Sequence, residues 1–169
     1  MNITVRKANI SDVASIVRIN VESWKNSYQN IFPIDYLDKL DSSNPKLIEK
    51  YRKKIDEYIV ATVDDMVVGF TRYGINQMDY SSEYGEIYAL YVDIDYREKN
   101  IGKVLLEYAI NDLKDKYKYC LVATLKDGRA NSFYLKNGGK LIGNEYFQLQ
   151  DKDYLENIYL YVLDKKVIK

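Results

Sequence analysis

The chain contains no histidine among its 169 residues. Histidine activates serine and cysteine nucleophiles in many enzymes and is the commonest protein ligand of metal ions. Cysteine is almost absent too, because Cys120 stands alone, which excludes an internal disulfide and predicts a reducing compartment. We therefore expect no metal site and no nucleophile of the Ser–His or Cys–His kind.

Long apolar runs and an excess of charge are also missing. No apolar segment approaches the ~20 residues of a membrane span, and the segment after Met1 lacks the pattern of a signal peptide. Lys+Arg and Asp+Glu both number 25, so no net field attracts nucleic acid or an anionic membrane. These absences predict a soluble cytoplasmic protein with neither nucleic-acid nor membrane partners.

The length fits a single domain over residues 1–169. Alternating and helical spacings of apolar residues predict strands at 3–7, 58–63, 66–73, 86–92, 119–125, 140–149 and 158–163, with helices between them. The expected order is β-α-α-β-β-β-α-β-α-β-β. It describes an α/β (α+β) fold with a mixed, mostly antiparallel sheet of six to seven strands flanked by helices.

Three local details are also predicted. Asp64 and Asp65 are expected to form a tight hairpin turn between the strands at 58–63 and 66–73. Ser11 is expected to cap the first helix, because serine oxygens accept hydrogen bonds from N–H groups at helix starts. Residues 150–156 are polar and acidic, so we expect them to form a loop between the last two strands.

The most informative stretch is Glu86–Lys116, a strand that leads through a basic turn into a helix. Apolar residues at Ile101, Leu105, Tyr108 and Leu113 predict one buried helix face. The free N–H groups and the dipole at the start of such a helix favour a phosphate. The dinucleotide G-x-G-x-x-G and the Walker A pattern are both absent from the turn, so neither usual nucleotide-binding motif explains it.

The turn at 97–102 reads Arg-Glu-Lys-Asn-Ile-Gly and follows a hydrophobic strand. It resembles the acyl-coenzyme A signature of the GNAT superfamily of N-acetyltransferases, [Arg/Gln]-x-x-Gly-x-[Gly/Ala]. Residues 127–138 are similar to the family's N-x-x-A-x-x-F-Y-x-x-x-G, and residues 23–28 to the first helix of many bacterial members. The resemblance implies an acetyl-CoA-dependent N-acetyltransferase that transfers its acetyl group directly to a primary amine.

The sequence departs from the family pattern at three positions. Asn100 replaces a loop glycine, Asp127 replaces the usual asparagine, and Gly139 stands where phenylalanine is common. Asparagine tolerates positive φ better than most residues, so we expect the loop conformation to be retained at Asn100. Gly139 is expected to cost some packing.

By this resemblance the coenzyme would contact the strand before the loop, the loop itself and the short helix at 130–136. The residues concerned are Leu90, Tyr91, Val92, Arg97, Glu98, Lys99, Asn100, Ile101, Gly102, Lys103, Val104, Asn131 and Tyr134. Tyrosine occurs 18 times, so most single tyrosines are packing residues, but the motif assigns Tyr134 as the acid that protonates the departing thiolate. A phenol with a pKa of about 10 is suited to that step.

The acceptor amine must lose a proton before it attacks, and the chain has no histidine to take it. A carboxylate, a tyrosinate or an ordered water remains, and the resemblance favours Glu86, with Glu83 as a weaker substitute. Trp24 and Tyr28 are expected to line the acceptor site. A polyamine, an amino sugar, an amino acid or a protein amine all stay open as acceptors.

The sequence also leaves two other functions and the oligomeric state open. A non-catalytic acyl-CoA-binding or regulatory module would keep the coenzyme site without turnover. A structural protein with a coincidental glycine turn would bind no coenzyme. A homodimer is compatible with every one of these readings.

Overall fold

The structure is a computed structural model that describes residues 1–164. The strands are β1 (Ile3–Lys7), β2 (Tyr58–Val63), β3 (Met66–Ile75), β4 (Tyr84–Val92), β5 (Tyr119–Leu125), β6 (Lys140–Leu149) and β7 (Lys152–Val162). The helices are α1 (Val13–Ser27), α2 (Ile34–Asp38), α3 (Pro45–Arg52), α4 (Ile101–Leu113) and α5 (Ala130–Lys136), with short 3-10 turns η1 (Ile10–Asp12), η2 (Ile55–Glu57) and η3 (Ile94–Tyr96).

The strands form a seven-stranded sheet in the order β1-β2-β3-β4-β5-β7-β6. The pairs β1–β2, β2–β3, β5–β7 and β6–β7 are antiparallel and β4–β5 is parallel, so the mixed, mostly antiparallel sheet predicted from the sequence is confirmed. Within residues 1–164, every helix is too short or too polar to span a lipid bilayer.

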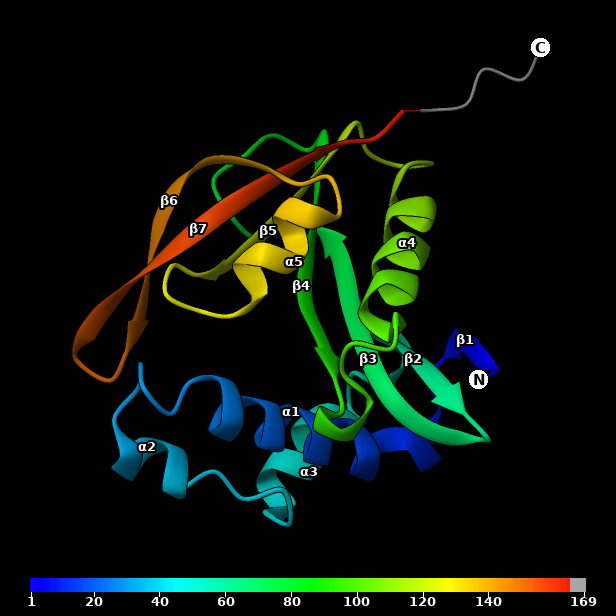
Figure 1. The fold of residues 1–169 in the computed structure, drawn as a ribbon, viewed down its shortest axis with the longest axis vertical. Helices are drawn as coiled ribbons and strands as arrows, with labels where there is room; N and C mark the ends of the chain where they lie inside the picture. The colour runs from blue at the N-terminus through cyan, green and yellow to red at the C-terminus, as the bar shows by residue number, and fades with distance from the viewer. Residues whose placement is uncertain (165–169) are drawn as a thin grey trace. The chain divides into compact units, whose positions relative to one another are not determined.

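Residue contacts divide the chain into two compact units. Unit 1 comprises Met1–Arg72 and Ala89–Tyr108; unit 2 comprises Tyr73–Tyr88 and the described residues from Ala109 onward. The elements β3, β4 and α4 each contribute residues to both units (Figure 1). The single domain expected over the whole chain stays a prediction.

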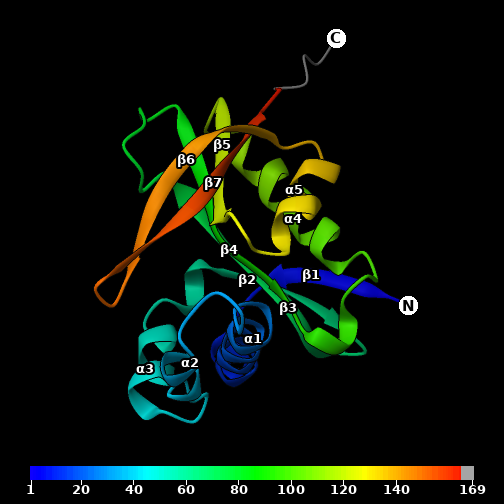
Figure 2. The same cartoon turned by 60° about the vertical axis from the view of Figure 1, so that its left-hand side comes forward.

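In unit 1, helices pack on both faces of the strands. Ile16 and Ile19 of α1 join a buried cluster with Phe70 of β3, and α1, α2 and α3 lie together in Figure 2. The neighbouring Gly69 points to the opposite face, where an added Cβ would lie 3.1 Å from Leu105 of α4. The absence of a side chain at Gly69 therefore lets α4 approach this sheet closely.

The buried face of α4 differs from the predicted one at one position. Ile101, Leu105 and Leu113 are buried as expected, but Tyr108 is 36% exposed. Ala109 is fully buried instead. Tyr108 and Ala109 follow Leu105 by three and four residues. In a helix with 3.6 residues per turn, the residue four positions on lies closer to the direction of Leu105 than the residue three positions on, so the expectation for Tyr108 was wrong.

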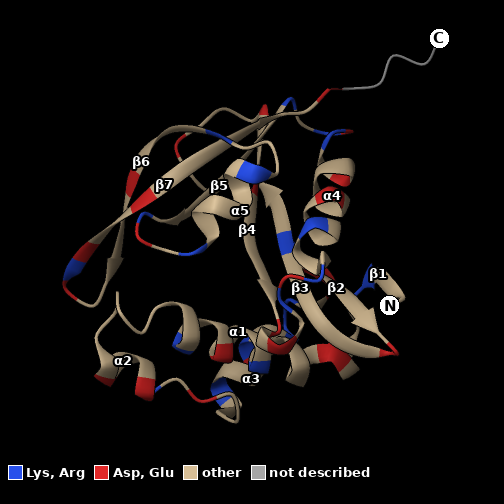
Figure 3. Cartoon of the chain, viewed as in Figure 1, with Lys and Arg blue, Asp and Glu red and all other residues tan. Residues whose placement is uncertain are grey.

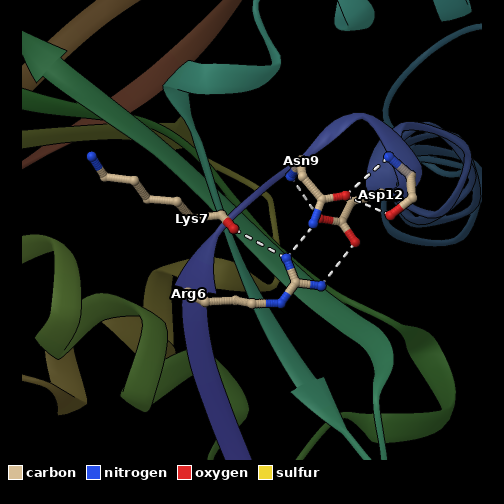
Figure 4. Close-up of polar contacts among 5 residues, drawn as sticks. Arg6, Lys7, Asn9 and Asp12 are labelled. Carbon is tan, nitrogen blue, oxygen red and sulfur yellow. Dashed lines mark hydrogen bonds and ion pairs between the residues drawn. The ribbon is translucent and has the colours of Figure 1, made fainter.

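The start of α1 is fixed by a polar cluster (Figure 4). The cap of η1 is Asn9, whose Oδ1 accepts from the Ser11 N–H at 3.0 Å, so the prediction of Ser11 as the cap was wrong. Asp12 accepts from the Asn9 N–H at 2.8 Å and from both terminal nitrogens of Arg6, at 2.8 and 3.0 Å. Burial alone would raise the pKa of Asp12, but these hydrogen bonds and the Arg6 charge hold it below its usual value.

In unit 2, β5, β7 and β6 carry α5 on one face (Figure 1). The Tyr134 ring of α5 lies 5.8 Å from the ring of Tyr159 in β7. Strand β7 begins at Lys152, so the loop predicted over residues 150–156 is mostly strand, and that prediction was wrong. The polar residues from Lys152 onward pair with β6. Strand pairing uses backbone groups, so an antiparallel hairpin tolerates polar side chains on a face that is open to solvent.

Candidate functional site

The turn between β4 and α4, in unit 1, directs backbone N–H groups outward. The Val104 N–H donates to the Asn100 carbonyl at 3.1 Å, so the N–H groups of residues 100–103 precede the first intrahelical bond of α4. Asn100 has φ of +66° and Glu98 has φ of +63°. The positive φ expected at Asn100 is therefore present, and the turn with its helix N-terminus fits a phosphate group.

The side chains of this turn differ in their exposure. Ile101 is 1% exposed and packs in the core, so only its main chain can meet a ligand. Glu98, Lys99, Asn100 and Lys103 are exposed, and Gly102 and Val104 are half-buried. The Lys99 ammonium lies 5.2 Å from the centre of the Tyr96 ring, and Lys103 lies 4.0 Å from Glu107.

Arg97 connects the turn to the last turn of α1. Its guanidinium donates to Asn26 Oδ1 at 2.7 Å and to Ser27 Oγ at 3.2 Å. A second link joins Arg18 of α1 to Asp93, directly after β4, at 3.0 Å. These contacts hold the turn at a defined place against α1.

The strand predicted to bind pantetheine, Leu90–Val92, is half-buried. Its Tyr91 hydroxyl accepts a hydrogen bond from the Trp24 indole at 3.0 Å. The Trp24 ring in turn meets Tyr28 edge-on at 5.2 Å and lies 5.6 Å from Phe32. Trp24 and Tyr28, the predicted acceptor residues, thus belong to an aromatic cluster in contact with Tyr91 of β4.

In unit 2, Tyr134 is 5% exposed, and its ring also meets Phe133 edge-on at 5.1 Å. Gly139 donates its N–H to the Tyr134 carbonyl at 2.8 Å, and the Tyr161 hydroxyl donates to the same oxygen at 3.2 Å. A Cβ on Gly139 would lie 2.9 Å from that carbonyl oxygen. Glycine at this position is therefore a requirement of the local packing rather than a loss of it.

Asn131 holds the turn between β5 and α5. Its Nδ2 donates to the carbonyl oxygens of Leu125, Lys126 and Gly128 at 2.8–3.0 Å. Its Oδ1 accepts from Asn157 at 2.8 Å and from the Tyr159 hydroxyl at 2.7 Å. The amide that was expected to contact pantetheine is thus engaged with the protein itself.

Unit 2 also brings three glutamates to one face of its strands. Glu86 pairs with Leu121 in the β4–β5 ladder, Leu121 pairs with Leu160, and Glu156 lies four residues before Leu160 on the same face of β7. Glu145 of β6 is directly opposite Glu156. Acidic segments are visible on both β6 and β7 in Figure 3.

Burial and mutual repulsion change the protonation of two of these carboxylates. Burial, together with the charges of Glu145 and Glu86, raises the pKa of Glu156 to about 7. Burial also raises the pKa of Glu86, although the Gln77 N–H, 2.8 Å from Oε1, favours the charged form. Glu156 was missed because residues 150–156 were expected to form a loop, whereas in the structure Glu156 lies in β7 opposite Glu145.

The glutamates and Tyr134 lie on opposite faces of unit 2. The Tyr134 ring packs against Tyr159 of β7. Tyr159 and Leu160 are adjacent in the strand, so their side chains lie on opposite faces. Because Glu156 shares the face of Leu160, Tyr159 faces away from Glu156. Among the described residues, the β4–β5 ladder comprises three pairs and ends at Glu86 and Leu121.

Two other titratable residues are unsuited to catalysis. Burial raises the pKa of the Cys120 thiol to about 12, which keeps it protonated and unreactive near neutral pH. Glu83, the weaker candidate base, forms an ion pair with Lys118 at 2.7 Å.

Comparison with known proteins identifies the family. The model of the acetyltransferase (GNAT) domain matches residues 54–138. An uncharacterized N-acetyltransferase, YuaI of Bacillus subtilis, is 30% identical over 62% of this chain and 60% of its own length, which is less than two thirds of that protein. A spermidine N(1)-acetyltransferase of Thermoplasma acidophilum is 29% identical over 83% of this chain and 90% of its own.

A solved structure agrees with these sequence relatives. The PaiA N-acetyltransferase of Thermoplasma acidophilum, in complex with coenzyme A, superposes with a TM-score of 0.73 at 26% identity, covering 93% of this chain and 98% of that one. The fold and motifs described above define an acetyltransferase domain. The chain belongs to the GNAT family of N-acetyltransferases, as the sequence predicted.

Proposed function

We propose that this protein transfers the acetyl group of acetyl-CoA directly to a primary amine of a multiply charged acceptor, such as a polyamine. The observation that carries the proposal is the set Glu86, Glu145 and Glu156 on one face, two of them with a raised pKa. Carboxylates attract the ammonium groups of such an acceptor, and one with a pKa near 7 can take a proton at neutral pH. A relative named as a spermidine acetyltransferase supports this choice.

Acetyl-CoA would supply an activated thioester when bound. The backbone N–H groups of residues 100–103 and the start of α4 would hold its pyrophosphate, with Lys99 and Lys103 adding positive charge. The backbone of Leu90–Val92 would bind the pantetheine arm and offer an N–H to the thioester oxygen. Trp24 fixes this strand through Tyr91.

The remaining steps belong to side chains of unit 2. The acceptor ammonium gives its proton to Glu156 or Glu86, the nitrogen bonds to the acetyl carbon, and the carbon–sulfur bond breaks. Tyr134 then donates its phenolic proton to the departing thiolate, and the second proton that the acceptor nitrogen loses as the amide forms restores the Tyr134 phenol. The charge of Glu86 contributes to the raised pKa of Glu156, so the protonation of Glu156 depends on that of Glu86.

The test is thiol release from acetyl-CoA over a panel of amines, with calorimetry of coenzyme A binding. Polyamines should give the highest kcat/KM, above monoamines and amino acids. Coenzyme A binding without thiol release on any amine would support the non-catalytic binding module instead. Absence of coenzyme A binding at millimolar concentration would reject both.

Tyr134→Phe tests the acid within the same assay. We expect kcat to fall by about 100-fold or more with unchanged affinity for coenzyme A, because only the leaving-group proton is lost. Tyr146→Phe, at a tyrosine that is 73% exposed, is the matched control and should retain activity. An unchanged kcat in Tyr134→Phe, with chemistry rate-limiting, would remove the assigned role.

A further inference from the structure

Strand β6 forms one edge of the sheet, and its outer side has no strand beside it. It is ten residues long, from Lys140 to Leu149, and it pairs with β7 on its inner side. Within residues 1–164, no other strand pairs with it. An unpaired row of backbone N–H and C=O groups of this length is a template for a further strand.

The two edges of the sheet differ in how they are protected against such pairing. Proteins protect edge strands by shortness, by charges, by proline and by bulges. The opposite edge strand, β1, has five residues, of which Arg6 and Lys7 are charged. Strand β6 has a bulge at residues 141–143, but residues 143–149 pair regularly with β7, contain no proline and carry one charge, at Glu145. This regular part of β6 therefore lacks the usual protection.

Tyr146 lies at the centre of the regular part, residues 143–149. Its side chain is 73% exposed, more than any other large hydrophobic side chain within residues 1–164. Its neighbours on the same face of β6 are Asn144 and Gln148, whose amide groups both donate and accept hydrogen bonds. A strand laid beside β6 would therefore meet an aromatic ring with an amide on either side of it.

These side chains complement themselves about a two-fold axis. When β6 pairs antiparallel with the β6 of a second copy and the axis passes beside Tyr146, the two Tyr146 rings face each other and Asn144 lies opposite Gln148. Opposed aromatic side chains and hydrogen-bonded polar pairs stabilise neighbouring strands. Glu145 then lies opposite Phe147, whereas an axis at Glu145 would oppose two carboxylates.

We propose that two copies of this chain form a dimer in which their β6 strands pair antiparallel around Tyr146. Basic and acidic residues number 25 each, so no net charge repels the second copy. A second copy supplies both members of every side-chain pair, whereas an unrelated partner has no reason to match them. The pairing uses backbone groups and exposed side chains of β6 and does not depend on the proposed function.

The mass of the protein in solution tests the dimer. Light scattering after size-exclusion chromatography, over a concentration series, should give twice the chain mass of 19.8 kDa. Tyr146→Lys would oppose two ammonium groups at the axis and should raise the dissociation constant of the dimer by about 10-fold or more. Tyr146→Phe keeps the ring pair and should stay dimeric. Met66→Lys, at a 57% exposed side chain of β3, is the matched control and should stay dimeric too.

An engineered disulfide tests the register. Tyr146→Cys would place two thiols opposite each other at the axis, where Cα atoms of opposed residues lie about 4.5–5.5 Å apart, within the range of a disulfide. Mild oxidation should therefore cross-link this variant into a covalent dimer. Gln148→Cys is the control, because its two copies would lie roughly 13 Å apart along the strands. The native Cys120 is fully buried and should not cross-link.

A wild-type protein that stays monomeric at every concentration would overturn the proposal. An unchanged dissociation constant in a folded Tyr146→Lys variant would overturn it too, because the interface would then lie elsewhere. Failure of Tyr146→Cys to cross-link, or cross-linking of Gln148→Cys in its place, would reject the pairing around Tyr146. Thermal unfolding shows whether each variant is folded, and if Tyr146→Lys loses its fold, the cross-link decides alone.

Discussion

The two compact units treat buried carboxylates in opposite ways. In unit 1, Asp12 is bound by Arg6 and has a lowered pKa, and Asp93 is 3.0 Å from Arg18. In unit 2, Glu86 and Glu156 lie among other carboxylates and have raised pKa values. Asp12, bound by Arg6, keeps its charge and fixes structure, whereas Glu156, among other carboxylates, exchanges a proton near neutral pH.

In the proposed mechanism, the two units have correspondingly different roles. In unit 1, ion pairs and hydrogen bonds fix α1, β4 and the turn before α4, whose backbone N–H groups are proposed to bind the coenzyme. In unit 2, Glu156, Glu86 and Tyr134 are the groups proposed to transfer protons. Substitutions in the first should change stability or coenzyme affinity, and those in the second should change pH dependence.

The largest effect is expected from Asp12→Asn. The change leaves Arg6 without its charged partner and weakens the cap at the start of α1, so the free energy of unfolding should fall by about 2–3 kcal/mol. In the wild type, the stability supplied by Asp12 is present above its unfolded pKa and is lost as the pH falls through its lower folded pKa. Urea unfolding between pH 2 and 7 measures both.

Asp38→Asn, at an exposed carboxylate of α2, is the control for Asp12→Asn and should be near neutral. The pH dependence of kcat/KM should be the same in both variants. A shifted pH–rate profile in Asp12→Asn would contradict the assignment of Asp12 to structure alone.

Glu156→Gln should have an intermediate effect. In the wild type, kcat/KM should fall below about pH 7, where Glu156 becomes protonated. The variant should lose about 10-fold in kcat/KM at pH 8, with a displaced acid limb. Glu145→Gln should instead move the limb to lower pH, because it removes one repelling charge, and Glu49→Gln on α3 should leave it unchanged.

Glu156 also makes a prediction for stability. Its folded pKa of about 7 exceeds the ordinary 4.5, so the folded protein holds this proton when the unfolded chain has lost it. Stability from this group is therefore present below pH 4.5 and is lost as the pH rises to about 7. Glu156→Gln should flatten that decline in melting temperature, and an unchanged decline would contradict the raised pKa.

The smallest effect is expected at Asn100. Alanine there must adopt φ of +66° without the side-chain hydrogen bonding that helps asparagine, which costs about 1 kcal/mol. Asn100→Ala should therefore lower the melting temperature by a few degrees and weaken coenzyme A binding, while Asn100→Gly should retain both. Lys99→Ala, at the neighbouring residue, should leave the melting temperature unchanged. Equal behaviour of the alanine and glycine variants would show that φ at this position is unimportant.

Local patterns in the sequence were sufficient for much of the fold. The two aspartates at 64 and 65 predicted a tight hairpin, and the structure joins β2 and β3 there with φ of +49° and +64°. The strand, turn and helix of 86–113 were also expected, since alternation and helical spacing depend on residues close in sequence.

The sequence by itself determined the family, the order of elements and the left-handed turn at Asn100. Only the tertiary structure decided which carboxylates share a face and which hydroxyl is buried. Glu156 meets Glu145 through strand pairing, and Ser23 is buried through the packing of α1. Pairing and burial join residues that are distant in the chain, and the pKa of a group depends on those neighbours rather than on its place in the sequence.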